Sequence, residues 1–270
     1  MRAKLIYASF TLLAIWSGIL TPYVSANEQL PEIAIVIDDI GNQRYRDQQA
    51  IRLQGPVAYA LLPHTPHARQ AANFAAKLGK EIILHIPMEP ISHKLPGPGA
   101  LRLDMEASSY LAKVNANLDA IPNIIGVNNH MGSRLTQNAD KMLLLMNEIR
   151  KRGNLFFLDS LTTHRSLANN IAQQYNIPST TRDVFLDHDV SLAAISQSFD
   201  RLIQIAKQKG RALAIGHPYP ETLEYLEYWL PRLERKGVKL ISLSAYIQKE
   251  KRHQKIWQAS LSRSRQALKN

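Results

Sequence analysis

The sequence contains no cysteine. Without thiols the chain can form no disulfide framework, zinc finger or iron–sulfur cluster, and it has no cysteine nucleophile. Any metal ion must therefore be bound by nitrogen and oxygen ligands. Acidic residues are also scarce: the 270 residues include 22 Asp and Glu but 33 Lys and Arg, which gives a formal net charge of +11. Such a charge suggests nucleic acid, an anionic membrane or an acidic polymer as a binding partner.

The excess positive charge is concentrated at the two ends of the sequence. Residues 1–26 contribute +2 and residues 249–270 contribute +6, so only +3 remains for residues 27–248. A body that is so nearly balanced, and that has no nucleic-acid-binding motif, excludes nucleic acid as the expected partner. The basic tail indicates a peripheral contact with an anionic envelope surface, to which Ile256 and Trp257 add a small apolar contact. A solvated helix is the alternative interpretation of the tail.

The first 26 residues have the pattern of an export signal. A basic start with Arg2 and Lys4 precedes the apolar run 5–20, and small residues follow at positions 24 and 26. We expect cleavage after Ala26, which places the mature chain in the periplasm. A retained membrane anchor is the alternative, because the apolar run is near the length that crosses a bilayer. The expected organisation is a signal peptide (1–26), one domain (27–248) and a basic C-terminal tail (249–270).

The body alternates short apolar runs with longer amphipathic stretches. The runs occupy residues 33–38, 57–62, 81–86, 124–128, 155–159, 180–186, 211–216 and 238–243. Most are continuous in hydrophobicity, which is typical of parallel strands that are buried on both faces. Clear helix patterns lie between them: one ends at Gly210, and another begins after Asn138 and ends at Gly153. Repeated strand–helix units predict an α/β fold with a parallel sheet, either a (β/α) barrel or an open doubly wound sheet.

Histidines and acids gather where the predicted strands end. They are Asp38, Asp39, His64, His67, His85, His130, Asp159, Asp183 and His217. The carboxyl ends of parallel strands meet at one edge of the sheet, where the active sites of α/β folds are assembled. Each residue also has a purely structural interpretation, since either aspartate of the pair could cap a helix and His64 with His67 could begin one. The Pro- and Gly-rich segment 92–99 is interpreted as a loop at the same edge.

His85, His130 and His217 favour a chemical role together with Asp39, because Pro, Gly and polar residues crowd the sequence around these histidines. Histidines and one carboxylate, without cysteine, fit a divalent metal centre of the His₂Asp type with an open position for water. Zinc is the first expectation, since it lowers the pKa of a bound water to roughly 7. Asp38 is suited to take the proton from that water, and His217 to protonate the leaving nitrogen.

Six motifs occur in order along the body. They read IDDIG (37–41), VAYALLPHTPHA (57–68), ILHIPMEP (83–90), GVNNHMGSR (126–134), FFLDS (156–160) and IGHPYPET (215–222). In this order they resemble the divergent polysaccharide deacetylases, relatives of the NodB-type carbohydrate esterases, over residues 31–248. The resemblance implies a distorted (β/α) barrel of about seven parallel strands. It also implies a metal-dependent hydrolase that removes acetyl groups from an N-acetylated glycan, such as peptidoglycan or an exopolysaccharide.

The resemblance implies a role for each residue that matches a family motif. In the classical enzymes an Asp-Asp pair after the first strand provides the base and a metal ligand, which correspond here to Asp38 and Asp39. A late strand ends in the catalytic histidine, which is similar in place to His217. Asp159 is expected to orient a catalytic or liganding group, as carboxylates behind metal ligands do.

Two departures from the classical pattern change the expected site. The loop at His85 has no second histidine, so we expect His130 on the next strand to complete a ligand set of Asp39, His85 and His130. The Arg-Pro-Tyr segment that assists the base is absent, and we expect the nearby Arg134, together with His64, to contact substrate. The missing histidine also favours an alternative, a non-catalytic envelope protein that binds a glycan or a protein on the same barrel. Another metal hydrolase, such as a phosphoesterase, is a third interpretation.

Overall fold

The computed structural model describes residues 30–252 of the chain. The predicted signal peptide lies outside this range, and so does the predicted basic tail except for residues 249–252. None of the helices within the described range combines the length and the hydrophobicity that crossing a bilayer requires.

Nine strands within residues 30–252 form one sheet, and all neighbouring strands are parallel. They are β1 (Glu32–Ile40), β2 (Ala58–Leu61), β3 (Ile82–Met88), β4 (Gly126–Met131), β5 (Phe156–Asp159), β6 (Ser179–Thr181), β7 (Val184–Phe185), β8 (Arg211–Gly216) and β9 (Lys239–Leu240). The order is β6-β5-β4-β3-β2-β1-β8-β7, and β9 pairs with β1 outside this path. The predicted α/β barrel is confirmed, with nine strands where about seven were predicted. The run 180–186 contributes to two of them, β6 and β7.

The two edge strands of the sheet are consecutive in the sequence. Only residues 182 and 183 separate β6 from β7, and a link of this length spans roughly 10 Å at most. The sheet therefore curves until its edges lie near each other, which makes a barrel distorted by one unpaired seam. Arg182 fills the seam, since its guanidinium donates to the carbonyl oxygens of Ser160 and Leu161 at 2.9 and 3.1 Å and stacks on Phe185.

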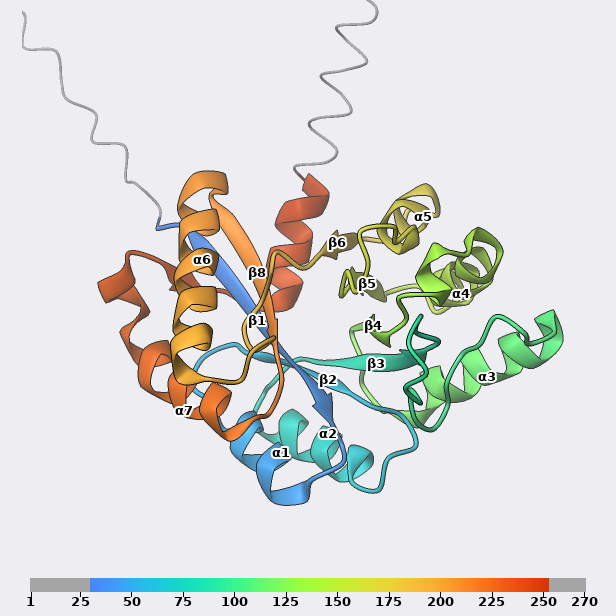
Figure 1. The fold of residues 1–270 in the computed structure, drawn as a ribbon, viewed down its shortest axis with the longest axis horizontal. Coiled ribbons are helices and arrows are strands. Elements are labelled where there is room, and N and C mark those ends of the chain that lie inside the picture. Colours follow the sequence, from blue (N-terminus) through green and yellow to red (C-terminus); the bar gives the residue numbers. More distant parts are fainter. Residues whose placement is uncertain (1–29, 253–270) are drawn as a thin grey trace, which may run out of the picture.

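Helices cover the outer face of the curved sheet (Figure 1). They are α1 (Arg44–Ile51), α2 (Ala68–Lys77), α3 (Ala107–Ala120), α4 (Ala139–Lys151), α5 (Ala168–Gln174), α6 (Leu192–Lys209) and α7 (Pro220–Trp229), with the 3₁₀ helices η1 (Leu135–Gln137) and η2 (Leu230–Lys236). Along β1, Ile33, Ile35 and Ile37 belong to the core under these helices, whereas Ala34 and Val36 belong to a second core inside the barrel. This alternation is the two-residue period of a strand, and burial of both faces explains the continuous apolar runs.

A further helix over residues 243–252 closes the interior of the barrel. Leu243, Tyr246 and Ile247 of this helix are buried in the inner core, at the three- and four-residue spacing of an apolar helix face. Lys249 pairs with Glu32 of β1 at 2.5 Å. The first residues of the predicted tail therefore belong to the folded barrel.

Both helix patterns singled out in the sequence are confirmed. Asn138 caps α4, and its Oδ1 accepts a hydrogen bond from the backbone N–H of Lys141 at 2.9 Å. Ser191 caps α6 in the same way, and α6 ends at Gly210, whose φ of 82° is a left-handed conformation that favours glycine. These caps fix the start of α4 and both ends of α6.

Candidate metal centre

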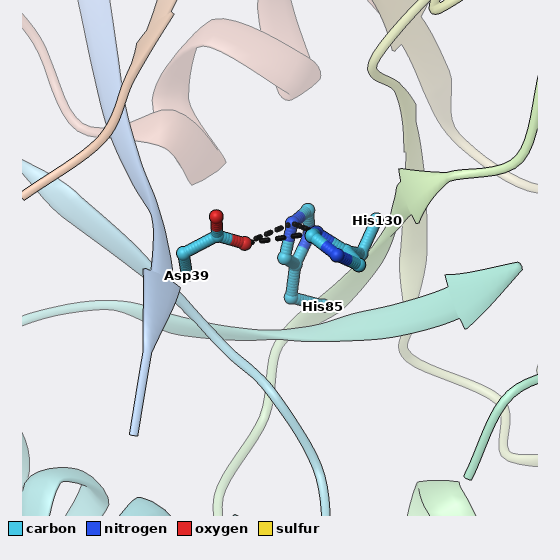
Figure 2. A group of neighbouring side chains, drawn as sticks. All are labelled: Asp39, His85 and His130. Carbon is cyan, nitrogen blue, oxygen red and sulfur yellow. Dashed lines mark hydrogen bonds and ion pairs between the residues drawn. The ribbon is translucent and has the colours of Figure 1, made fainter. Parts of the chain in front are cut away.

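Side chains from three strands converge at the carboxyl edge of the sheet (Figure 2). Asp39 lies at the end of β1, His85 in β3 and His130 in β4. Asp39 Oδ1 lies 3.2 Å from His85 Nε2 and 2.9 Å from His130 Nδ1, and the two nitrogens are 3.1 Å apart. The structure thus brings together the three residues that the sequence predicts as metal ligands.

An irregularity in β1 lets both aspartates of the pair reach this site. Adjacent residues of a regular strand point to opposite faces, but the pairing of β1 with β2 shifts register between Ile37 and Ile40. Asp39 lies there with a φ of 60°, a left-handed conformation that aspartate tolerates better than most residues. Both carboxylates therefore face His85, and Asp38 Oδ2 lies 3.5 Å from its Nε2.

The carboxylate of Asp39 has the properties of a metal ligand. Its Oδ1 is buried but has no hydrogen-bond partner, because its close contacts with the imidazoles lack hydrogen-bonding geometry. A tetrahedral zinc with ligand distances of roughly 2.0 Å separates its ligand atoms by about 3.3 Å, which is near the observed 2.9–3.2 Å. Burial raises the pKa of Asp39, but the imidazoles of His130 and His85 outweigh burial and hold that pKa well below its usual range. The donor set therefore fits a divalent ion.

Asn128 fixes the orientation of His85. The Nδ1 atom of His85 lies 2.8 Å from Asn128 Oδ1, which can only accept, so Nδ1 carries the proton and Nε2 directs its lone pair at the site. The amide nitrogen of Asn128 donates to Asp38 Oδ1 at 2.9 Å. Asn128 was not predicted as a site residue. Its position two residues before His130 could have indicated it, because this spacing places both side chains on one face of β4.

Asp38 is almost completely buried beside the three ligands. Burial raises its pKa, and the nearby imidazoles of His85 and His217 offset this only in part. A carboxylate whose pKa is raised is better matched to accepting a proton near neutral pH. The environment of Asp38 is therefore suited to the predicted role of a base.

His217 follows β8 and is held by the buried carboxylate of Asp187. Its Nδ1 donates to Asp187 Oδ1 at 2.9 Å, and its backbone N–H donates to Asp187 Oδ2 at 2.6 Å. Burial lowers the pKa of His217, but the Asp187 carboxylate outweighs burial, and the pKa is raised to about 9. The imidazole is therefore protonated at neutral pH. Asp187 was not predicted from the sequence, although it directly follows the apolar run 180–186, just as Asp39 directly follows the run 33–38.

Two cavities flank the metal centre. The first, which we call the arginine-side cavity, has a volume of about 170 Å³ and is lined by Asp39, Arg46, His217 and Tyr219 among others. The second, the proline-side cavity, has a volume of about 390 Å³ and is lined by Asp39, His130 and the segment 95–98. The predicted loop at the active face thus contributes to the site. Asp39 and Asn42 line both cavities, so the two meet at the candidate metal centre.

The remaining predicted residues lie around this centre rather than in it. His64 is exposed, and its Nε2 lies 2.9 Å from Asn117 Oδ1. It does not line either cavity. Both oxygens of Asp159 accept hydrogen bonds within its own loop, from Leu161 N–H at 2.9 Å and Ser166 Oγ at 2.7 Å. Arg134 is half exposed and lies 3.6 Å from Glu89. These contacts organise the surrounding loops.

Comparison with known proteins places the chain in a family. The family model described as divergent polysaccharide deacetylase matches residues 35–247. The chain belongs to the divergent polysaccharide deacetylases. The uncharacterised protein YibQ of Escherichia coli K12 is 36% identical to this divergent polysaccharide deacetylase over 196 residues, which cover 73% of the chain. The match spans only 61% of the length of YibQ.

Solved structures are similar to this divergent polysaccharide deacetylase in fold. An uncharacterised protein from Agrobacterium tumefaciens C58 is 28% identical and superimposes with a TM-score of 0.77, covering 82% of the chain and 91% of that structure. The catalytic domain of a peptidoglycan N-acetylglucosamine deacetylase from Eubacterium rectale has a TM-score of 0.50 at 11% identity, over 80% of the chain and 90% of that domain. At that identity the second likeness concerns the fold alone.

Proposed function

We propose that this divergent polysaccharide deacetylase is an exported, metal-dependent hydrolase that removes acetyl groups from an N-acetylated glycan of the periplasm, either peptidoglycan or an exopolysaccharide. The observation that carries the proposal is the convergence of Asp39, His85 and His130 on one point, with a buried Asp39 oxygen that lacks a hydrogen-bond partner. These three residues would hold the ion, and zinc suits their two imidazoles and one carboxylate.

When bound, the ion would lower the pKa of a coordinated water to roughly 7 and polarise the amide carbonyl. Asp38 accepts the proton that the attacking water loses, because burial has raised its pKa. His217 donates its Nε2 proton to the leaving amine, since Nδ1 is bound to Asp187 and the imidazole is protonated at neutral pH. Asn128 holds His85 and Asp38 in fixed relation through its two hydrogen bonds.

The shape of the site supports a polymeric substrate. The two cavities meet at Asp39 and Asn42, so sugar units of one chain can occupy both sides of the centre at once. The Eubacterium rectale domain of similar fold is described as acting on peptidoglycan. Peptide-free glycan strands of peptidoglycan are therefore the first substrate to test.

The proposal is tested on the purified chain by metal analysis and by acetate release from such strands. We expect near-stoichiometric zinc, and we expect Asp39→Ala and His130→Ala to lose both the metal and the activity. Asp38→Asn should keep the metal but lose about 100-fold or more in kcat. The exposed His164 serves as a control, because it lies outside both cavities, and His164→Ala should match the unaltered chain.

The result also separates the two alternatives. A chain without transition metal, whose Asp39→Ala and His130→Ala variants behave like the parent, contradicts the hydrolase. Tight glycan binding that a chelator leaves unchanged, without acetate release, favours a non-catalytic binding protein on the same barrel. Release of phosphate from phosphate esters instead of acetate favours a phosphoesterase.

A further inference from the structure

One cationic side chain that lines the arginine-side cavity has no partner in the described part of the chain. Arg46, on α1, is half-buried and lines this cavity together with Asp39 and His217. Within residues 30–252 its guanidinium makes no hydrogen bond and no ion pair. A guanidinium has five N–H donors, and partial burial without an acceptor costs free energy. Arg46 therefore lies ready to bind an acceptor that residues 30–252 do not supply.

The neighbouring acids do not satisfy Arg46. Asp47 follows it in the sequence, but its Oδ2 accepts from the backbone N–H groups of Gly41 and Gln43 at 3.0 and 3.1 Å, and its Oδ1 is buried without a hydrogen-bond partner, Arg46 included. The Oδ1 of Asp39 lies between the imidazoles of the metal centre. The remaining charged group of the cavity is His217, whose own carboxylate partner lies behind it. The cavity is thus lined by two cationic side chains, Arg46 and His217, beside the carboxylates of Asp39 and Asp47, neither of which forms an ion pair with Arg46.

We infer that Arg46 forms a carboxylate-binding subsite, and that the preferred substrate is an N-acetylated glycan with a carboxylate on or next to the sugar that is deacetylated. This inference rests on the proposed function. An arginine fork matches the two oxygens of a carboxylate and binds them through parallel hydrogen bonds. His217, the proposed proton donor to the leaving amine, lines the same cavity, so the carboxylate lies close to the acetylated nitrogen. Tyr219, whose ring lies 5.7 Å from His217, offers a surface for the sugar ring.

The test compares two forms of one glycan. Peptide-free peptidoglycan strands carry a lactyl carboxylate, and chemical reduction converts it to an alcohol without altering the sugar chain. Binding of fluorescently labelled strands is measured by anisotropy, and acetate release is measured in parallel with zinc present. We expect the parent chain to bind the carboxylated strands about tenfold or more tightly than the reduced ones. Arg46→Gln should abolish this preference, and Arg46→Lys should restore part of it.

A matched variant controls for loss of charge on α1. Arg44 lies on the same helix but outside the arginine-side cavity, so Arg44→Gln should keep the full preference. Equal binding of both strands by the parent chain overturns the inference, and so does a preference that survives in Arg46→Gln or a failure to bind either strand. Equal acetate release from both strands leaves the hydrolase intact and overturns only the subsite. A carboxylate preference in binding without acetate release supports the subsite and overturns only the hydrolase.

Discussion

Replacement of Asp187 by asparagine removes the negative charge that keeps a proton on His217. The pKa of His217 is raised to about 9 from an ordinary 6.5, chiefly by this carboxylate acting against burial. The difference corresponds to about 3 kcal/mol in favour of the protonated form. Without the charge the lowering effect of burial remains, and we expect the pKa to fall to about 6.5 or below, so that at pH 8 the protonated fraction drops from about 90% to about 3% or less.

Two measurements check this expectation. The dependence of kcat on pH should lose its alkaline limb near pH 9 and show one at about pH 6.5 or below, because the leaving amine then lacks its proton donor above that pH. An NMR titration of the His217 ring in the metal-free chain should report the same change directly. Zinc affinity should be unchanged, since Asp187 contacts none of the three candidate ligands.

The control is Asp189→Asn, because Asp189 is an exposed acid two residues further along the same loop. This variant should keep the alkaline limb near pH 9. The reasoning is refuted if Asp187→Asn and Asp189→Asn have the same pH profile and the same His217 titration.

Stability gives an independent readout of the same pair. The folded-state pKa of His217 lies above the unfolded value, so the pair stabilises the fold fully below about pH 6.5 and loses this contribution as pH rises through about 9. The free energy of unfolding of the parent chain should therefore fall across this window by up to about 3 kcal/mol more than that of Asp187→Asn.

Other predictions concern the ligands, the core and the chain ends. Asn128→Ala should weaken zinc binding by about 10- to 100-fold in a chelator competition, because His85 loses its orienting hydrogen bond; unchanged affinity contradicts that role. Phe199→Ala, in the core under α6, should lower the free energy of unfolding in urea by about 3–5 kcal/mol. Mass spectrometry of the exported chain should find Asn27 as its first residue, whereas an intact start favours the anchor. Deletion of residues 253–270 should reduce envelope association in cell fractionation at unchanged Tm, and unaltered fractionation contradicts the tether.

The pattern of apolar runs was sufficient for a parallel α/β sheet and for the edge at which the site lies, whereas the choice of a barrel over an open sheet came from the family resemblance. Continuous apolar runs predicted buried parallel strands, because both faces of each strand pack against other residues. The split of the run 180–186 was not predictable, since it depends on where the closing barrel leaves its seam. The contact of Asn128 with His85 depends on the register of β4 against β3, which no local pattern encodes. The place of the His64 side chain was not predictable either, because it depends on a φ of 58° and on the contact with Asn117, which holds the ring outside both cavities.

The pairing of β1 with β8 has a consequence for how the chain folds. Ile33 pairs with Ala212, so the first strand acquires this neighbour only when nearly the whole described chain is present. Contacts of such long sequence separation form slowly, because a large loop must close before they stabilise anything. For a chain predicted to leave the cytoplasm, this would keep the barrel open at β1 until residues 211–216 have been synthesised.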